Sequence, residues 1–227
     1  MLKNMLKLLQ YLSSLLLFIL VLAFLYHQYS LNKEKKLLTS SIGQRVEVDG
    51  KKMNVYVAGN GPKTLVFLSG SGTSSPILDF KSLYSKLVKD YRVVVVEKFG
   101  YGFSDDWSKH RDLDTILSQT RKAIQKADVK GPYVLLPHSM SGLEALHWSA
   151  SYPKEVEAII GLDMSLPQAY DKYRSNRLLY KTLQLAANLG LSRWLYSPDK
   201  EIHSLSNGSL NPKEKSIYKA LFYRRPL

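Results

Sequence analysis

The segment from Tyr133 to Leu146 carries the residue types best placed to do chemistry. It reads YVLLPHSMSGLEAL, an apolar run followed by Ser139, small residues and a helix-forming stretch. A tight strand-to-helix turn holds a serine hydroxyl above the sheet edge, where it can act as a nucleophile. Amides at the start of the following helix can stabilise a developing oxyanion. The alternative interpretation is that Ser139 only caps that helix.

Alternating strand and helix signals surround this serine between residues 44 and 162. Short apolar runs predict strands, and apolar residues three or four apart predict helices. The predicted strands are Arg45–Val48, Met53–Ala58, Thr64–Leu68, Tyr91–Val96, Tyr133–Leu136 and Val156–Leu162, and the predicted helices are Asp79–Lys89, Leu113–Ala127 and Ser141–Tyr152. Two initial antiparallel strands followed by strand–helix units predict an α/β fold, a mostly parallel sheet covered by helices on both faces.

Two glycine-rich turns complete a recognisable set of motifs. Residues 69–72 (SGSG) follow the third predicted strand, and residues 97–105 (EKFGYGFSD) follow the fourth. With residues 138–142 (HSMSG) they resemble, in the same order, three motifs of the α/β-hydrolase superfamily. These are its His-Gly-x-Gly loop, its Asp-x-x-Gly-x-Gly-x-Ser turn and its His-Ser-Met-Gly-Gly nucleophile turn. The resemblance covers roughly residues 43–167 and implies an α/β-hydrolase fold.

The resemblance also implies roles for individual residues. Ser139 would be the nucleophile, and the backbone amides of Ser71 and Met140 would form the oxyanion hole. The implied reaction is hydrolysis of a small-molecule ester or amide through an acyl-enzyme, with neither a metal nor an organic cofactor. Two departures weaken the match, because Pro137 and Ser141 stand where the motif has glycines. A proline there lacks the N–H of a central strand.

The acid and the histidine that such a serine needs are harder to find. In this fold they follow the serine in the order acid, then histidine, but only His147 and His203 lie downstream of Ser139. His147 lies two turns along the predicted helix, and His203 lies in the late helical region. Asp163 is a candidate acid or an ordinary loop residue. We therefore expect a chain truncated within its cap, with Val156–Leu162 at a sheet edge and no histidine within reach of the serine.

The N-terminal residues predict a membrane anchor. Leu8 to Tyr26 contains 19 residues without charge, which as a helix span about 28 Å, close to the roughly 30 Å of a bilayer core. Tyrosines and lysines lie at both ends, as at membrane interfaces. A cleaved signal peptide is the main alternative, but no small-x-small site follows the run. We expect a single-pass protein with residues 1–40 as anchor and basic linker and with the catalytic domain on the extracytoplasmic side.

Composition limits the other classes of function. The net charge of +13 divides into +4 for residues 1–40, +2 for residues 41–167 and +7 for residues 168–227. The predicted hydrolase core, residues 41–167, is thus nearly neutral, and the basic ends suit anionic lipid headgroups better than nucleic acid. Ordinary solvated lysines would give the same charge. The absence of cysteine excludes disulfides and thiolate metal sites.

Residues 168–227 complete the expected organisation. Tyr170–Leu189 and Pro212–Tyr223 read as amphipathic helices, and they predict an incomplete helical cap. Nucleotide binding at Gly70 and Gly72 is excluded because the third glycine of that fingerprint is missing. The main alternative to a hydrolase is a non-catalytic, membrane-anchored binding protein that keeps the same scaffold.

Overall fold

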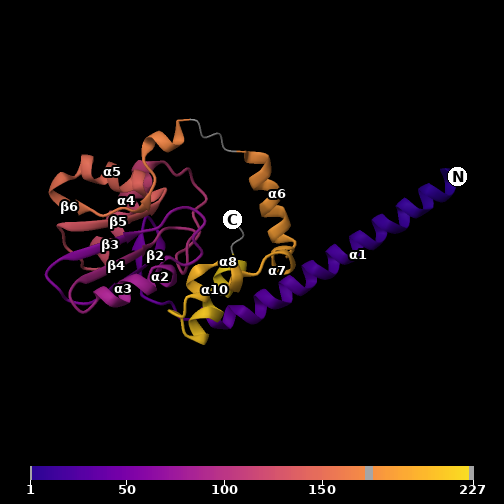
Figure 1. The fold of residues 1–227 in the computed structure, drawn as a ribbon, viewed down its shortest axis with the longest axis horizontal. Coiled ribbons are helices and arrows are strands. Elements are labelled where there is room, and N and C mark those ends of the chain that lie inside the picture. Colours follow the sequence, from indigo (N-terminus) through magenta and orange to yellow (C-terminus); the bar gives the residue numbers. More distant parts are fainter. Residues whose placement is uncertain (1, 172–175, 225–227) are drawn as a thin grey trace.

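A computed structural model describes residues 2–171 and 176–224 of the chain. A seven-stranded sheet forms its centre, in the order β1-β2-β4-β3-β5-β6, with β7 paired to β5 (Figure 1). The strands are β1 (Gln44–Val48), β2 (Lys51–Ala58), β3 (Thr64–Leu68), β4 (Arg92–Glu97), β5 (Tyr133–Ser139), β6 (Val156–Ile159) and β7 (Leu162–Met164).

The sheet is antiparallel at its beginning and parallel elsewhere. β1 and β2 form a hairpin whose turn residues, Asp49 and Gly50, have φ of 50° and 78°, a conformation that favours this residue pair. β2 pairs antiparallel with β4, whereas β3 pairs parallel with both β4 and β5. All of β3 and nearly all of β4 are buried, as expected for strands covered on both faces. The α/β fold class predicted from the sequence is confirmed.

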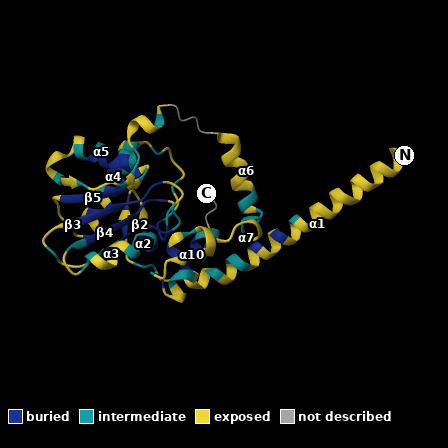
Figure 2. Ribbon diagram, in the orientation of Figure 1, coloured by how far each residue is buried: buried dark blue, intermediate teal, exposed yellow. Residues whose placement is uncertain are grey.

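Helices cover both faces of the sheet. They are α2 (Pro76–Asp79), α3 (Lys81–Leu87), α4 (Leu113–Lys126), α5 (Ser141–Ser151) and the short 3-10 helix η2 (Pro153–Glu155). On one face, α4 and α5 bury Ile124 and Trp148 against the strands. On the other, α2 and α3 bury Ile77 and Tyr84. Figure 2 shows the buried residues gathered in the strands and on the helix sides that face them.

The prediction of one continuous sixth strand is wrong. In place of Val156–Leu162 the chain forms β6 and β7, which pair with successive parts of β5. Ile160 and Gly161 separate them, and the Ile160 amide donates to the Leu135 carbonyl at 2.9 Å. β6 lies at the edge of the sheet, and its residues are exposed or half-buried. A short strand therefore follows the sixth, which the sequence interpretation had not included.

A cap of helices follows β7. Its elements are η3 (Pro167–Tyr170), α6 (Arg177–Asn188), α7 (Ser192–Leu195), α8 (Pro198–Glu201), α9 (His203–Ser206) and α10 (Pro212–Arg224). The predicted helix Pro212–Tyr223 is present as α10. The prediction of one helix over Tyr170–Leu189 is wrong at its start, because α6 begins at Arg177; residues 172–175 lie outside the described residues. The cap packs on the core through an apolar cluster that joins Leu78 and Phe103 to Leu205 and Leu221.

The N-terminal helix α1 (Leu2–Glu34) projects away from the body and continues into the 3-10 turn η1 (Lys35–Leu38) (Figure 1). By length and composition alone it could cross a membrane, a test that a signal sequence would also pass. Its C-terminal part contacts the cap. Arg193 of α7 donates to His27 at 2.9 Å and to the two carboxylate oxygens of Glu34 at 2.8 and 2.6 Å. These contacts fix α1 to the cap.

Candidate active site

Ser139 lies at the strand-to-helix turn that the sequence predicts. Its φ is 54°, in the left-handed region that residues other than glycine rarely occupy. β5 ends at Ser139 and α5 begins at Ser141, so the backbone changes from strand to helix across Met140. Surrounding contacts must hold a strained residue of this kind. The turn of residues 137–141, here called the elbow, therefore has the geometry that presents a nucleophile above a sheet.

The Ser141 side chain makes hydrogen bonds that stabilise the elbow. The side chain is buried, and its Oγ lies 2.9 Å from the His138 amide and 2.7 Å from the Leu68 carbonyl. The hydroxyl thus accepts one hydrogen bond inside the elbow and donates one to the end of β3. The serine that stands in place of glycine therefore stabilises this turn by hydrogen bonds and causes no steric clash.

Pro137 is accommodated at a break in the sheet. The Leu135 carbonyl accepts a hydrogen bond from the Ile160 amide, which directly follows β6. The backbone of Pro137, two residues further along β5, faces the same side of the strand. On that side β5 pairs with β6 up to Leu135 and with β7 only from His138 onward. Pro137 therefore lies where β5 passes from one partner strand to the next, an irregular place in a sheet of the kind that tolerates proline.

The turn after β3 touches the elbow directly. A Cβ placed on Gly70 would lie 2.8 Å from the Ser139 Cβ and 3.1 Å from its Oγ, so only glycine allows this approach. Ser71 follows Gly70 and Met140 follows Ser139, which places the two predicted oxyanion amides one residue beyond the contact. Across residues 2–171 and 176–224, neither amide donates a hydrogen bond to another residue. Both remain available as donors to a bound oxyanion.

Asp163, the predicted acid, lies on the strand next to the elbow. Met164 pairs with Ser139, and the Ser165 amide donates to the Ser139 carbonyl at 2.8 Å. Asp163 itself has a φ of 50° and is exposed. The structure thus brings the backbone of this segment to the serine while the aspartate side chain meets solvent. Its role as the acid stays a prediction.

The histidines do not supply an obvious base. In the described part of the chain, none of them hydrogen-bonds to the Ser139 hydroxyl. His147 lies on the outer side of α5, 2.7 Å from the exposed Asp114. His203 is exposed on α9. His138 precedes the serine, and its ring meets Phe80 edge-on at 6.3 Å between centroids.

The second glycine-rich turn closes around a buried acid. Glu97 accepts from the Phe103 amide at 2.7 Å, from the Asn54 side chain at 2.9 Å and from the Ser75 hydroxyl at 3.1 Å. Its complete burial raises the pKa of its carboxyl group. A Cβ on Gly102 would collide with that carboxyl group at 2.0 Å. Glu97 is thus a structural centre that fixes this turn, and it does not face the elbow.

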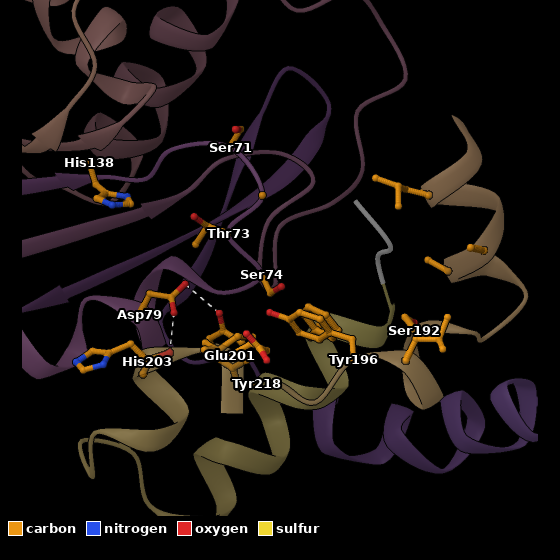
Figure 3. Close-up of a pocket in the computed structure, with 18 of the residues that line it drawn as sticks. Ser71, Thr73, Ser74, Asp79, His138, Ser192, Tyr196, Glu201, His203 and Tyr218 are labelled. Carbon is orange, nitrogen blue, oxygen red and sulfur yellow. Dashed lines mark hydrogen bonds between the residues drawn. The ribbon is translucent and has the colours of Figure 1, made fainter. Parts of the chain in front are cut away.

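A large cavity separates the core from the cap. Its volume is about 810 Å³, within the usual range of small-molecule sites. Ser71, Thr73, Ser74, Asp79 and His138 line its core side (Figure 3). Its cap side has apolar residues, Leu183, Ala186, Ala187, Leu191 and Leu195, and also polar ones, among them Glu201 and His203. A smaller cavity of about 280 Å³ is lined by Gly70 and Met140. Since the neighbours of Ser139 line different cavities, the elbow lies between the two.

Asp79 connects the core to the cap at the edge of the large cavity. Its carboxylate accepts from the Ser204 hydroxyl of α9 at 2.8 Å and from the Tyr218 hydroxyl of α10 at 3.2 Å (Figure 3). The neighbouring Lys81 binds Glu214 of α10 at 2.5 Å. Burial raises the pKa of Asp79 from 3.8 to about 6. The cap is thus held by a carboxyl group that titrates within an accessible pH range.

This pKa gives a pH dependence that can be measured. A carboxyl group whose pKa is raised by folding favours the folded state when protonated, so its contribution is complete below pH 3.8 and falls until about pH 6. The raised pKa corresponds to about 3 kcal/mol. We expect Asp79→Asn to remove this downward slope in the free energy of unfolding. Urea titrations of both proteins between pH 4 and 7 test it, and parallel pH profiles would contradict the assignment.

Comparisons with known proteins place this geometry in a family. The family described as alpha/beta hydrolase fold matches residues 63–197, more than half of the chain. The chain belongs to the α/β-hydrolase family. This α/β hydrolase is 44% identical over 217 residues to the uncharacterized protein YbdG of Bacillus subtilis (strain 168), covering 94% of this chain and 66% of YbdG. It is 26% identical over 108 residues to the uncharacterized protein YqjL of that organism, covering 48% of this chain and 42% of YqjL.

Solved structures share the fold of this α/β hydrolase at low identity. An epoxide hydrolase variant from Bacillus megaterium has 17% identity and a TM-score of 0.59, over 81% of this chain and 68% of that one. A serine hydrolase involved in carbazole degradation, the CarC enzyme, has 19% identity and a TM-score of 0.53, over 80% and 69%. The recognition made from the three motifs is thereby confirmed at the level of family and fold.

Sequence reasoning missed the residues that connect the site to its surroundings. Asp79 read only as the first residue of a predicted helix, and no local pattern shows that it meets Ser204, which is 125 residues away in the sequence. Lys98 and Glu144 form a buried ion pair behind the elbow. A lysine directly after an apolar strand was the one available signal, since lysine is rarely buried without a partner.

Proposed function

We propose that this chain forms the nucleophile and oxyanion site of a membrane-anchored serine hydrolase acting on esters or amides. The observation that carries the proposal is the left-handed Ser139 in contact with the Gly70 turn. Family membership supports hydrolysis in general, and one structural relative is described as a serine hydrolase. The alternative, a binding protein that keeps the scaffold, is favoured by the lack of a histidine on the serine within the described residues.

The proposed reaction begins with attack of the Ser139 hydroxyl oxygen on the substrate carbonyl carbon. The amides of Ser71 and Met140 stabilise the oxyanion, and the alcohol or amine leaves with a proton to give an acyl-enzyme. Water then attacks the acyl carbon and releases the acid. The scheme needs no metal or organic cofactor. It also needs a base. The part of YbdG that matches this chain makes up 66% of that protein. We propose that the base is supplied by the part of the fold outside this matched stretch.

The membrane component of the proposal concerns α1. We propose that the uncharged stretch from Leu8 to Tyr26 crosses the bilayer once and that the hydrolase domain lies on the extracytoplasmic side. Nearly all of its large apolar side chains are exposed, which supports contact with lipid in preference to a protein core. Carbonate extraction of membranes, with protease protection to assign the side, tests both statements.

Fluorophosphonate labelling tests the chemistry. Oxyanion donors alone retain about 10³–10⁴-fold acceleration over water when a triad is incomplete, so we expect slow labelling of this chain under long incubation. Mass spectrometry should place the adduct on Ser139. YbdG, treated in parallel, should react faster if it carries the base. A folded chain that stays unlabelled while YbdG also stays unlabelled would favour the binding scaffold.

Gly70→Ala tests the contact between turn and elbow. The new Cβ would lie 2.8 Å from the Ser139 Cβ, so the serine or the oxyanion turn must move. A displacement of about 1 Å can cost about 100-fold in rate, and overpacking costs about 1–3 kcal/mol in stability. We expect labelling to slow by at least about tenfold in a protein that still unfolds cooperatively. Unchanged labelling kinetics would show that the turn is not part of the reactive site.

A further inference from the structure

We propose that the substrate is a lipophilic ester whose acyl chain occupies the 810 Å³ cavity and enters it from the bilayer beside α1. The inference rests on the proposed function for its ester chemistry and on the cavity for its choice of substrate. Three observations support it: an apolar wall that no element of the described residues covers, polar groups beside the elbow, and a shared border with the anchoring helix.

The apolar wall comes from α6 and α7. Leu183, Ala186 and Ala187 lie on one side of α6 at helical spacing and line the cavity together with Leu191 and Leu195. No residue of α6 is buried, so within residues 2–171 and 176–224 this face packs against no core. Exposed apolar patches can mark ligand-binding grooves or interaction sites. A flexible hydrocarbon chain needs just such a wall and no hydrogen-bonding partners along it.

The polar groups of the cavity that lie nearest the elbow come from the core side, and Glu201 and His203 add polar groups on the cap side. Ser71, Ser74 and His138 line the core side (Figure 3), and Ser71 and His138 are sequence neighbours of the two residues in contact, Gly70 and Ser139. A chain lying along the cap wall would therefore present its carboxyl end at the elbow. A mostly apolar wall with a few polar groups next to the elbow suits an acyl ester.

The far wall of the cavity borders the anchoring helix. Tyr26 ends the uncharged stretch of α1 and meets Trp194 edge-on at 5.8 Å, while Trp194 remains 67% exposed. Aromatic residues at such a position mark the headgroup level of a membrane. Leu195, the next residue, lines the cavity. One short helix, held to Glu34 by Arg193, thus separates the cavity from the expected bilayer surface.

The charge of this region agrees with a membrane surface. From residue 176 to residue 198 the sequence contains no acidic residue and three basic ones, Arg177, Lys181 and Arg193, of which Arg193 pairs with Glu34. Arg177 and Lys181 lie on α6, the helix that walls the cavity. Basic side chains next to a bilayer attract anionic headgroups. The wall that receives the chain would therefore face the lipid from which the substrate comes.

Binding of cis-parinaric acid to the full chain in vesicles tests the cavity. Nitroxide-labelled lipid quenches the probe in the bilayer, so only probe held by the protein fluoresces. Ala187→Trp fills the cavity and should weaken binding by at least about tenfold. Ala150→Trp, on the exposed end of α5, is the matched control and should leave binding unchanged. Ala186→Trp provides a second filled cavity if Ala187→Trp fails to fold.

Trp194→Glu tests the route of entry. A charge at the expected headgroup level should slow uptake of the probe from vesicles several-fold while leaving its equilibrium affinity in detergent unchanged. Uptake at the original rate would overturn entry beside α1. Wild-type protein that fails to retain the probe, or filled variants that bind it normally, would overturn the choice of substrate.

The two proposals can fail separately. Ser139→Ala should bind the probe as the original chain does, because the cavity does not depend on the nucleophile. Probe binding without any fluorophosphonate labelling would uphold the acyl-chain site while removing the hydrolase. Labelling of Ser139 without probe binding would uphold the hydrolase and remove the acyl-chain site.

Discussion

Ser139→Ala is expected to reduce fluorophosphonate labelling by at least about 100-fold, to the level of background. The reason is chemical, because alanine has no oxygen to bond to phosphorus. The substitution adds no volume to a site where a Cβ on Gly70 would already lie 2.8 Å from the Ser139 Cβ. The change in the free energy of unfolding should therefore stay within about 1 kcal/mol. The two readouts are gel fluorescence of the labelled protein and its urea unfolding.

Ser71→Ala is the matched control for this loss. It removes a hydroxyl near the elbow but keeps the backbone amide that is proposed to bind the oxyanion, so most of the labelling should remain. If labelling instead vanished in Ser71→Ala and persisted in Ser139→Ala, the nucleophile would be a different residue. Equal labelling of all three proteins would identify the signal as surface modification.

The central part of the fold follows from local sequence patterns. The run Thr64–Leu68 has the bounds of β3 as predicted, because a strand buried on both faces is apolar at nearly every position. The elbow was predictable for a related reason. An apolar strand that runs through a serine into a helix-forming stretch is the pattern of such a turn, and Ser139 is found there with positive φ.

Other elements depend on contacts that no local pattern encodes. Val156–Leu162 is apolar throughout, yet it divides at Ile160 and Gly161 because its two halves pair with different parts of β5. The contact of Arg193 with Glu34 joins residues 159 positions apart. Such pairings arise from the three-dimensional arrangement of the cap and α1. The cavity between core and cap was unpredictable for the same reason, although α6 is amphipathic.

Lys98→Met is expected to lower the free energy of unfolding by about 3–5 kcal/mol. Lys98 and Glu144 are only 7% and 2% exposed, and they form an ion pair behind the elbow. Lys98 also donates to the Ser69 carbonyl at 3.0 Å, while Thr120 donates to Glu144 at 2.7 Å. Methionine would fill the space and leave the Glu144 charge buried without its partner. Urea unfolding followed by tryptophan fluorescence measures the loss.

Lys122→Met serves as the control for removal of a lysine. Lys122 pairs with Asp49 at 2.6 Å, but its side chain is 49% exposed, so the loss should stay within about 1 kcal/mol. The double variant Lys98→Met with Glu144→Leu should recover most of the stability, because it removes the unpaired charge together with its partner. Equal losses in Lys98→Met and Lys122→Met would show that burial of the pair has little energetic effect.

The same pair should also influence the reactivity of Ser139. Glu144 lies in the first turn of α5, close to the amides proposed to receive the oxyanion, and a negative charge there opposes the positive potential of the helix start. Lys98 neutralises that charge. We therefore expect Lys98→Met to slow labelling of Ser139 beyond any effect of unfolding, and the added Glu144→Leu to restore the rate. If the double variant regained stability but not labelling, Lys98 would act on the site through the Ser69 carbonyl and not through the charge of Glu144.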